Sequence, residues 1–260
     1  MNNSLVLAAH SGPDMAPQAR SGGWPAYAPA RVLALFEGMA PTYGFAPWLS
    51  VGLLGRWRRQ LVAGLRQPGA WQPVQVVDLM AGGADLWPAL RRHFGAGLQL
   101  TAVDFSVSML ARAMHHKAGP NLTLHPADAL ATGLPAGQAR AVTCAFGLKT
   151  LAPEAYAALA QEAARLLQPG GQLALLEVSL PARGWLRRLL PTYLAVLMPV
   201  VRRLYPAAGA HAALAGYLRR GPDLRQLRQA LRQAGFRQLR QQRLWPGCAV
   251  LLTAELPAAR

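Results

Sequence analysis

Apolar positions divide the chain into a short helical part and a longer part in which strands alternate with helices. Between residues 31 and 66 they recur three and four positions apart, which predicts two helices separated at Pro41. From residue 74 onward, short strand segments, the first of them β-branched, alternate with helical segments. The expected strands are 74–79, 98–104, 121–125, 141–146, 172–178, 236–243 and 248–254, and the expected helices end near residue 94 or span 107–117, 153–167 and 223–234.

The order of these elements predicts an α/β fold. Strands joined through single helices require right-handed crossovers, which give a parallel sheet. The last two strands are joined only by Trp245-Pro246-Gly247, so they should pair as an antiparallel hairpin. We therefore expect a mostly parallel, seven-stranded sheet that ends in an antiparallel C-terminal hairpin.

Two segments fall outside this alternation, and we expect residues 31–256 to form one domain with 31–70 as an N-terminal helical cap. Residues 1–30 are rich in Pro, Gly, Ala and Ser, which is typical of a flexible leader. Segment 181–220 separates the fifth strand from the last helix, and its apolar centre, 189–201, is flanked by arginine pairs. This centre is too short for a membrane span. We predict a helical lid or insertion, with an interfacial helix and an ordinary buried helix as alternatives.

Composition adds an unusual charge. The 260 residues are 52% hydrophobic and 15% charged, which allows a sizeable core, and they carry a formal net charge of +16. Lys117 and Lys149 are the only lysines among 27 basic residues, so arginine dominates. This bias fits either genomic composition or an anionic partner, which would be nucleic acid or a membrane surface. We do not expect nucleic acid, because no zinc knuckle, RNA-recognition aromatic pair or interleaved basic and aromatic stretch is present.

The cysteine and histidine content indicates whether the protein binds a metal, and the apolar stretches indicate where in the cell it is located. Two cysteines, Cys144 and Cys248, exclude a disulfide scaffold and a four-cysteine zinc site. His115-His116 occupy adjacent positions on a helix and do not share a face, so we expect no metal. Neither a secretory signal nor an apolar stretch of about 20 residues is visible. We expect a cytoplasmic protein, and peripheral contact at the inner face of the membrane is the alternative location.

Residues suited to chemistry lie where the first two strands end. In an open α/β sheet, ligands bind beyond the carboxyl ends of the strands. The first strand contains Asp78 and runs into Ala81-Gly82-Gly83, where glycine lets the backbone approach a ligand and the next helix offers unpaired N–H groups. Asp104 ends the second strand about 20 residues later, where an acid can accept both hydroxyls of a ribose. The alternatives are structural, since Asp104 could cap the next helix and Asp78 could brace the turn.

An ordered set of short motifs covers the chain from about residue 31 to 256. The motifs are Val77-Asp78-Leu79 with Gly82 and Asp85-Leu86, Val103-Asp104-Phe105-Ser106 with Met109-Leu110, Ala127-Asp128-Ala129, Ala145-Phe146-Gly147-Leu148, Leu167-Gln168-Pro169-Gly170-Gly171, Leu176-Glu177-Val178-Ser179 and Ala234-Gly235-Phe236. In this order and spacing, the chain resembles the UbiE-type ubiquinone/menaquinone methyltransferases of the class I S-adenosylmethionine-dependent superfamily. The resemblance implies a Rossmann-like class I methyltransferase fold and S-adenosylmethionine as the cofactor.

The resemblance also implies roles at the matching positions. The turn at 81–83 would face the methionine part of the cofactor, and Asp104 would face the ribose. Asp128-Ala129 would meet the adenine edge and Ala145-Phe146 the reacting methyl, while Tyr43 would belong to an N-terminal element that closes over the cofactor. The implied cofactor-binding residues are Tyr43, Asp78, Ala81, Gly82, Gly83, Asp104, Phe105, Met109, Asp128, Ala129, Ala145 and Phe146.

Five positions depart from the family pattern. Ala84 stands in place of the third small residue of the turn, a glycine, Met80 replaces Ala or Gly, and Gly44 replaces Asp. The quinone enzymes usually carry Phe-Gly-x-Arg-Asn, whereas here Lys149-Thr150 follow Phe146-Gly147-Leu148. Lys149 is our candidate catalytic residue, because it can stabilise negative charge on a substrate oxygen or, if desolvated, act as a base. The alternative is a solvated lysine at the start of a loop.

The leading functional hypothesis is a methyltransferase that C-methylates an apolar aromatic or quinone-like small molecule. Displacement at a sulfonium methyl needs positioning and an apolar channel but no metal. An O- or N-methyltransferase acting on a lipid or secondary metabolite is the first alternative, because a fold does not fix the substrate. A basic nucleic-acid-binding protein with a degenerate methyltransferase fold is the second.

Overall fold

The computed structural model describes most of the predicted domain. The described residues are 29–45, 50, 52–67, 73–117, 121–180 and 221–258, together with single positions between 184 and 203. The expected leader, apart from its last two residues, and most of segment 181–220 lie outside the described residues. The flexible leader and the helical lid therefore stay predictions.

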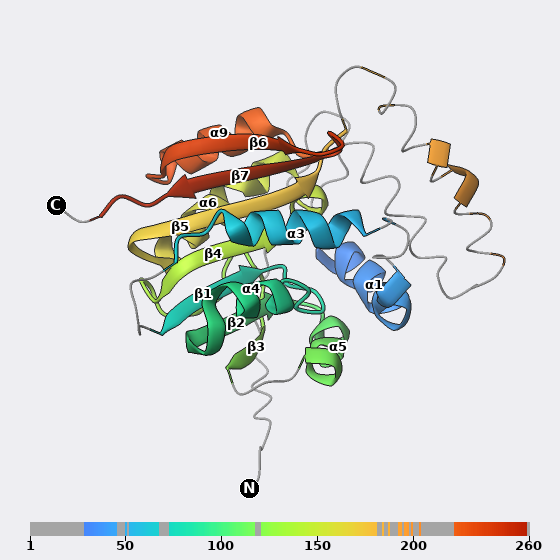
Figure 1. The fold of residues 1–260 in the computed structure, drawn as a ribbon, viewed down its shortest axis with the longest axis horizontal. Coiled ribbons are helices and arrows are strands. Elements are labelled where there is room, and N and C mark those ends of the chain that lie inside the picture. The colour runs from blue at the N-terminus through green and yellow to red at the C-terminus, as the bar shows by residue number, and fades with distance from the viewer. Residues whose placement is uncertain are drawn as a thin grey trace, which may run out of the picture.

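Seven strands form one sheet in the order β3-β2-β1-β4-β5-β7-β6 (Figure 1). Strands β1 to β5 run parallel, and β7 lies antiparallel between β5 and β6. The predicted sheet, mostly parallel with an antiparallel C-terminal hairpin, is confirmed. The strands are β1 (Val74–Leu79), β2 (Leu98–Asp104), β3 (Leu122–Pro126), β4 (Ala139–Ala145), β5 (Leu167–Val178), β6 (Arg237–Leu244) and β7 (Ala249–Glu255).

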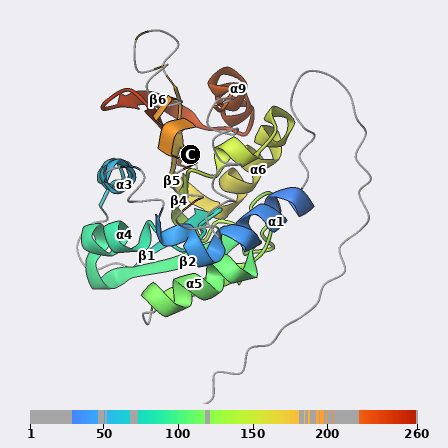
Figure 2. The same ribbon diagram turned by 90° about the vertical axis from the view of Figure 1, so that its right-hand side faces the viewer.

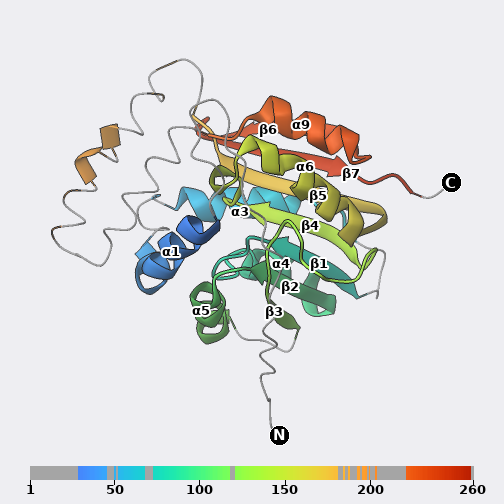
Figure 3. The same ribbon diagram turned by 180° about the vertical axis from the view of Figure 1, so that it is seen from behind.

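Helices cover both faces of the sheet. Helices α3, α4 and α5 lie on one face and α6 and α9 on the other, as Figures 2 and 3 show from the side and from behind. The helices are α1 (Pro29–Met39), α3 (Leu53–Ala63), α4 (Trp87–Phe94), α5 (Val107–Lys117), α6 (Tyr156–Leu166) and α9 (Leu224–Gln233). Short 3-10 helices span Ala40–Phe45, Gly95–Gly97, Leu148–Thr150 and Pro153–Ala155.

Each face of the sheet has its own apolar core. On one face, Trp57 and Leu61 of α3 and Leu90 of α4 pack against inward-facing strand residues. On the other, Leu159 of α6 and Leu227 of α9 do the same. Burying one such side chain contributes about 1.5–3 kcal/mol, so these cores hold the strand ends in fixed positions. None of the helices in the described part of the chain has the length and apolar character needed to cross a bilayer.

β5 begins earlier than predicted. The predicted strand begins at residue 172, but Pro169-Gly170-Gly171, which are residues typical of a turn, already lie inside β5. The pairing register with β4 shifts here, which is where proline is tolerated in a sheet. A Cβ on Gly171 would lie 2.8 Å from the carbonyl oxygen of Gln168, so the close approach of the backbone requires glycine. The turn residues therefore mark a strand irregularity.

The N-terminal elements lie at the carboxyl edge of the parallel strands. Figure 1 shows α1 beyond these strand ends, beside α5, while α3 crosses the face of the sheet. The region predicted as a helical cap thus contains α1, the 3-10 helix Ala40–Phe45 and α3. This arrangement brings residues before position 60 next to the turn that follows β1.

Candidate functional site

The turn after β1 is compact and strained. Met80 and Ala84 have φ angles of 53° and 52°, in the left-handed region that non-glycine residues rarely occupy. Gly82 has φ 55°, and a Cβ there would lie 3.2 Å from the Met109 side chain and 3.7 Å from the Tyr43 hydroxyl. The side chains of Tyr43 and Met109 therefore both approach the turn at Gly82.

Asp104 links this turn to the start of α5. Its Oδ2 accepts a hydrogen bond from the Gly82 N–H at 2.7 Å, and its Oδ1 accepts one from the Ser106 N–H at 2.9 Å. The side chain is buried, and burial raises the pKa of the Asp104 carboxyl against the opposite effect of these two hydrogen bonds. Each carboxylate oxygen has a second lone pair with which it can accept a ligand hydroxyl.

Glu37 caps α5 from outside that helix, and sequence reasoning missed it. Ser106 Oγ donates to Glu37 Oε1 at 2.7 Å, and Ser108 Oγ donates to Oε2. These hydrogen bonds lower the pKa of the Glu37 carboxyl. Ser106 also caps α5, since its Oγ accepts the Met109 N–H at 3.2 Å. A signal for Glu37 was its place as an acid in the amphipathic helix that precedes Pro41.

Asp78 lies under the turn. Thr143 Oγ1 on β4 donates to Asp78 Oδ1 at 2.7 Å, and the carboxyl group is almost completely buried. Burial raises the pKa of Asp78 to about 7, although the Thr143 hydrogen bond and the charge of Arg58 act in the opposite direction. The residue therefore joins β1 to β4 directly beneath the strained backbone.

Phe146 and Lys149 follow the carboxyl end of β4 and contact residues near the end of β5. Phe146 has φ 65°, and its N–H donates to the Leu176 carbonyl at 2.7 Å. The Lys149 ammonium donates to the Phe146 carbonyl and lies 3.6 Å from the fully buried carboxylate of Glu177. Glu177 also accepts the Lys149 N–H at 2.9 Å. Lys149 is thus a buried, paired lysine and not a solvated one at a loop start.

Arg58 of α3 is a second cation beside the Phe146 ring, and we did not predict it from the sequence. Its Nη2 forms an ion pair with Asp85 Oδ2 at 3.0 Å. Its guanidinium carbon lies 5.3 Å from the Phe146 ring centroid, and the Lys149 ammonium lies 5.8 Å from the same centroid. The signal was an arginine directly after Trp57, on a helix whose apolar stripe faces the sheet.

Gly147 packs closely against the side chains of Met80 and Cys144. A Cβ on this residue would lie 2.7 Å from Met80 Sδ, 2.8 Å from Met80 Cβ and 3.1 Å from Cys144 Sγ. Met80, where the family has Ala or Gly, therefore fills the space beside Gly147 that a side chain there would need. A similar contact explains Gly44, where a Cβ would lie 2.8 Å from a guanidinium nitrogen of Arg112.

The remaining predicted cofactor residues lie at the same edge of the sheet. Asp128 is exposed and accepts the Leu130 N–H at 2.9 Å, and Ala129 is buried. The Ala127 N–H donates to the Asp104 carbonyl at 3.3 Å, which holds this segment beside the end of β2. Ala145 and Phe105 are half-buried. In the described part of the chain, no group of three or more His, Cys, Asp or Glu side chains is arranged to hold a metal.

These residues fit a cofactor with a ribose and an amino-acid end. The glycine turn leaves a cradle that a Cβ would fill, and an acid lies beside it. Arg58 Nε is a buried donor that has no hydrogen-bond partner in the structure, which leaves a positive group at the turn for an anionic ligand atom. The combination suits an amino-acid-bearing nucleoside.

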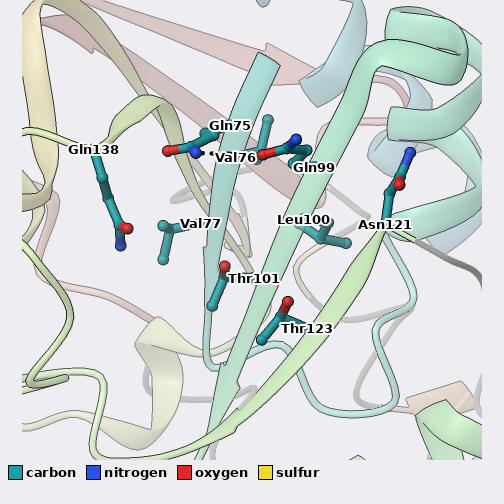
Figure 4. A pocket seen from close by; sticks show the side chains of 9 residues that line it. All are labelled: Gln75, Val76, Val77, Gln99, Leu100, Thr101, Asn121, Thr123 and Gln138. Atoms are coloured by element: carbon teal, nitrogen blue, oxygen red, sulfur yellow. Dashed lines mark hydrogen bonds between the residues drawn. The ribbon is translucent and has the colours of Figure 1, made fainter. Parts of the chain in front are cut away.

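A cavity of about 260 Å³ lies elsewhere, on the sheet face toward the amino ends of β1 and β2 (Figure 4). Uncharged side chains line it, and Gln75 Nε2 donates to Gln99 Oε1 at 3.3 Å. The lining residues are Gln75, Val76, Val77, Gln99, Leu100, Thr101, Asn121, Thr123 and Gln138. None of the predicted site residues lines this cavity, so we do not assign it to the candidate site.

Known proteins match the chain over most of its length. A model of the ubiE/COQ5 methyltransferase family matches residues 27–254. The chain is 28% identical over 231 residues to the ubiquinone/menaquinone biosynthesis C-methyltransferase UbiE of Geobacter sulfurreducens, covering 86% of this chain and 88% of the relative. It is 34% identical over 228 residues to the demethylmenaquinone methyltransferase of Mycobacterium tuberculosis, covering 86% and 91%.

A solved structure supports the fold. Human N-acetylserotonin methyltransferase in complex with S-adenosylmethionine superposes with a TM-score of 0.56 at 16% identity, over 86% of this chain and 59% of that one. At this identity the likeness concerns the arrangement of strands and helices. The Rossmann-like class I methyltransferase architecture predicted from the sequence is confirmed.

Proposed function

The chain belongs to the ubiE/COQ5 methyltransferase family and is an S-adenosylmethionine-dependent methyltransferase, and we propose that it methylates a carbon atom of an apolar, quinone-like small molecule. Relatives named for demethylmenaquinone and for 2-phytyl-1,4-naphtoquinone, each about 30% identical to this chain, support this substrate class. The family match carries the proposed substrate class, and the junction at Asp104, where one acid holds both the glycine turn and the start of α5, supports a cofactor site at this sheet edge.

The proposed cofactor contacts follow the strand ends. Tyr43 and the turn Ala81-Gly82-Gly83 hold the methionine part, and Asp104 receives the ribose hydroxyls with Phe105 and Met109 beside it. Asp78 supports the turn from below. Asp128 and Ala129 border the adenine, and Ala145 and Phe146 lie beneath the methyl group. These assignments rest on position at one sheet edge and on the contacts that join Tyr43, Met109 and Asp104 to Gly82.

The proposed chemistry divides between the cofactor and the protein. When bound, S-adenosylmethionine supplies an electrophilic methyl group on a sulfonium centre. The Phe146 ring forms an apolar floor that excludes water, and its position is fixed because Arg58 and Lys149 lie within cation–π distance of it. We propose that Lys149 uses its third N–H, beyond those directed at the Phe146 carbonyl and Glu177, to stabilise negative charge on the substrate oxygen, which makes the neighbouring ring carbon more nucleophilic.

We also propose peripheral contact between this protein and the inner face of the membrane, where an apolar quinone would be dissolved. Trp245, in the turn between β6 and β7, is 64% exposed, and its ring lies 5.2 Å from the Arg56 guanidinium. The Trp245 carbonyl accepts the Trp57 indole N–H at 2.7 Å, and the Trp57 ring lies 6.4 Å from that of Phe146. An exposed tryptophan beside arginine suits the headgroup region of an anionic bilayer.

Product analysis tests the proposed function. The protein would be incubated with isotopically labelled S-adenosylmethionine and reduced demethylmenaquinone, and fragmentation mass spectrometry would locate the label. We expect the label on a ring carbon, and the Asp104→Ala variant serves as the control with impaired cofactor binding. Label on an oxygen or nitrogen of an alternative phenol or amine, with none on the quinone ring, would contradict C-methylation.

A further inference from the structure

Arg58 and Asp85 form a pair of opposite charges beside the glycine turn. The Arg58 side chain is 10% exposed and that of Asp85 is 26% exposed, and their facing atoms lie 3.0 Å apart. Asp85 follows directly after the turn, whereas Arg58 comes from α3, on the face of the sheet that this helix covers. The pair therefore joins two elements at the position where an amino-acid end of the cofactor would lie.

Arg58 has a donor that its protein contacts do not use. Its Nη2 bonds Asp85, but its Nε is buried without a hydrogen-bond partner in the structure. A buried N–H of a cation without an acceptor costs free energy, and such groups in native proteins usually meet a ligand, ion or water. The Arg58 Nε–H could therefore donate to an anionic acceptor other than Asp85.

We propose that Arg58 and Asp85 bind the zwitterionic amino-acid end of S-adenosylmethionine, with Arg58 donating to its carboxylate and Asp85 accepting from its ammonium. This inference rests on the proposed function, because it takes the cofactor as given. The paired charges match the paired charges of the ligand, and a planar guanidinium can donate to two carboxylates at once. Lys149, the other buried cation near Phe146, is already engaged by the Phe146 carbonyl and Glu177.

Three ligands that differ in the amino-acid end test this inference by calorimetry. S-Adenosylhomocysteine carries both charges, decarboxylated S-adenosylmethionine lacks the carboxylate, and 5′-methylthioadenosine lacks both groups. We expect Arg58→Met to weaken binding of S-adenosylhomocysteine by about 10- to 100-fold, the scale of a lost charge-assisted hydrogen bond. Binding of the other two ligands should change by less than about threefold, because they offer Arg58 no carboxylate.

Asp85→Asn should give a different pattern from Arg58→Met. It should weaken binding of S-adenosylhomocysteine and of decarboxylated S-adenosylmethionine, because both keep the ammonium. Binding of 5′-methylthioadenosine should stay unchanged. Arg56→Met is the matched control, since Arg56 lies two positions away on α3 and is exposed over Trp245. Arg58→Lys keeps the charge without the planar fork, so it should retain the fold and lose part of the affinity for S-adenosylhomocysteine.

Three results would overturn the inference. These are wild-type affinity of Arg58→Met for S-adenosylhomocysteine, an equal loss for all three ligands, or a carboxylate-dependent loss that appears in Arg112→Met and not in Arg58→Met. The last comparison matters because Arg112 also lies against Gly83. If the wild-type protein binds none of the three ligands, the proposed function fails instead. Binding of 5′-methylthioadenosine therefore separates the two failures.

Discussion

Asp104 accepts a hydrogen bond from the backbone N–H of Gly82 at 2.7 Å, so an acid at the end of β2 holds the turn that follows β1. The same carboxylate accepts the Ser106 N–H at the start of α5. A residue expected to bind ribose hydroxyls is therefore also part of the scaffold of its own site. Its substitution should change ligand affinity and stability together.

Asp104→Ala should weaken binding of S-adenosylhomocysteine by about 30- to 1000-fold, the scale of two charge-assisted hydrogen bonds. It should also lower the free energy of unfolding by about 2–4 kcal/mol, because two buried N–H groups lose their acceptor. Calorimetric titration and urea denaturation measure the two effects. Asp128→Asn is the control for stability alone, because it changes an exposed acid but keeps an acceptor for the Leu130 N–H, and it should change stability by less than about 0.5 kcal/mol. Unchanged affinity in Asp104→Ala would remove this residue from the site.

Gly147→Ala should lower the free energy of unfolding by about 1–3 kcal/mol, the usual cost of overpacking a close-packed position. The added Cβ would lie 2.7 Å from Met80 Sδ and 2.8 Å from Met80 Cβ. Adding Met80→Ala should restore only part of the stability, because the Cβ remains, whereas Met80→Gly should restore more. Denaturation of the single and double variants measures this order. Full rescue by Met80→Ala would mean that only the thioether obstructs the new methyl group.

The fold could be predicted from the sequence because local patterns and global order agreed. Most strands of the sheet coincide with a β-branched or apolar run, whereas β6 is rich in Arg and Gln. The short connection before Cys248 predicted the antiparallel pair. The start of β5 was misplaced because Pro169-Gly170-Gly171 is equally typical of a turn and of a strand irregularity. Only the pairing of β4 with β5 distinguishes these cases.

The site was predicted less completely, because several of its contacts join residues far apart in the chain. The ends of the strands could be predicted from the sequence, so Asp78, Asp104 and Lys149 could be placed at the carboxyl edge of the sheet. Glu37 and Arg58 could not, since each reaches the site from a helix whose position depends on tertiary packing. The sequence also gave no sign that the Lys149 ammonium would meet the buried Glu177 carboxylate.

Asp78 should make stability depend on pH. Burial raises its pKa from an ordinary value of 3.8 to about 7, so the folded state binds a proton more tightly than the unfolded state. Protonation of Asp78 therefore adds to the free energy of unfolding at low pH, and this contribution is lost as the pH rises from about 4 to about 7. Asp78→Asn keeps an acceptor for Thr143 without the ionisation. The melting temperature of this variant relative to wild type should rise between pH 5 and pH 8.

Asp128→Asn, at an exposed carboxyl, is the control for that pH series. Its melting temperature relative to wild type should be nearly flat over the same range. A difference between Asp78→Asn and wild type that does not vary with pH would show that Asp78 titrates in the folded protein as it does in the unfolded chain.

Trp245 should contribute to membrane association. Trp245→Ala should weaken binding to vesicles that contain anionic lipid by about tenfold, since an exposed indole is lost from the headgroup region. Arg56→Gln should weaken it by about fivefold and reduce the salt dependence, at about 1 kcal/mol for each arginine near the surface. Flotation at low and high salt measures both effects, with Arg92→Gln on α4 as the exposed-arginine control. Wild-type protein that stays with the soluble fraction at low salt would contradict the membrane contact.

Lys149 should affect turnover more than cofactor affinity. Lys149→Met should lower kcat by about 10²-fold, the scale of losing one electrostatic stabiliser of the transition state. The affinity for S-adenosylhomocysteine should barely change, because the predicted adenosine contacts lie at Asp104 and Asp128. Lys149→Arg should retain more activity than Lys149→Met if the role is charge, and little if the role is proton transfer. Steady-state kinetics on the reduced quinone measures these differences.

A structural role for Lys149 must be separated from a catalytic one. Removing its ammonium leaves the fully buried Glu177 carboxylate without a cation, which should cost about 3–5 kcal/mol of stability. Lys149→Met combined with Glu177→Gln removes both charges, so it should recover most of that stability. If Lys149 acts on the substrate, turnover stays low in the double variant although the fold is restored. Recovery of kcat together with stability would mean that the ion pair only shapes the floor of the site through the Phe146 carbonyl.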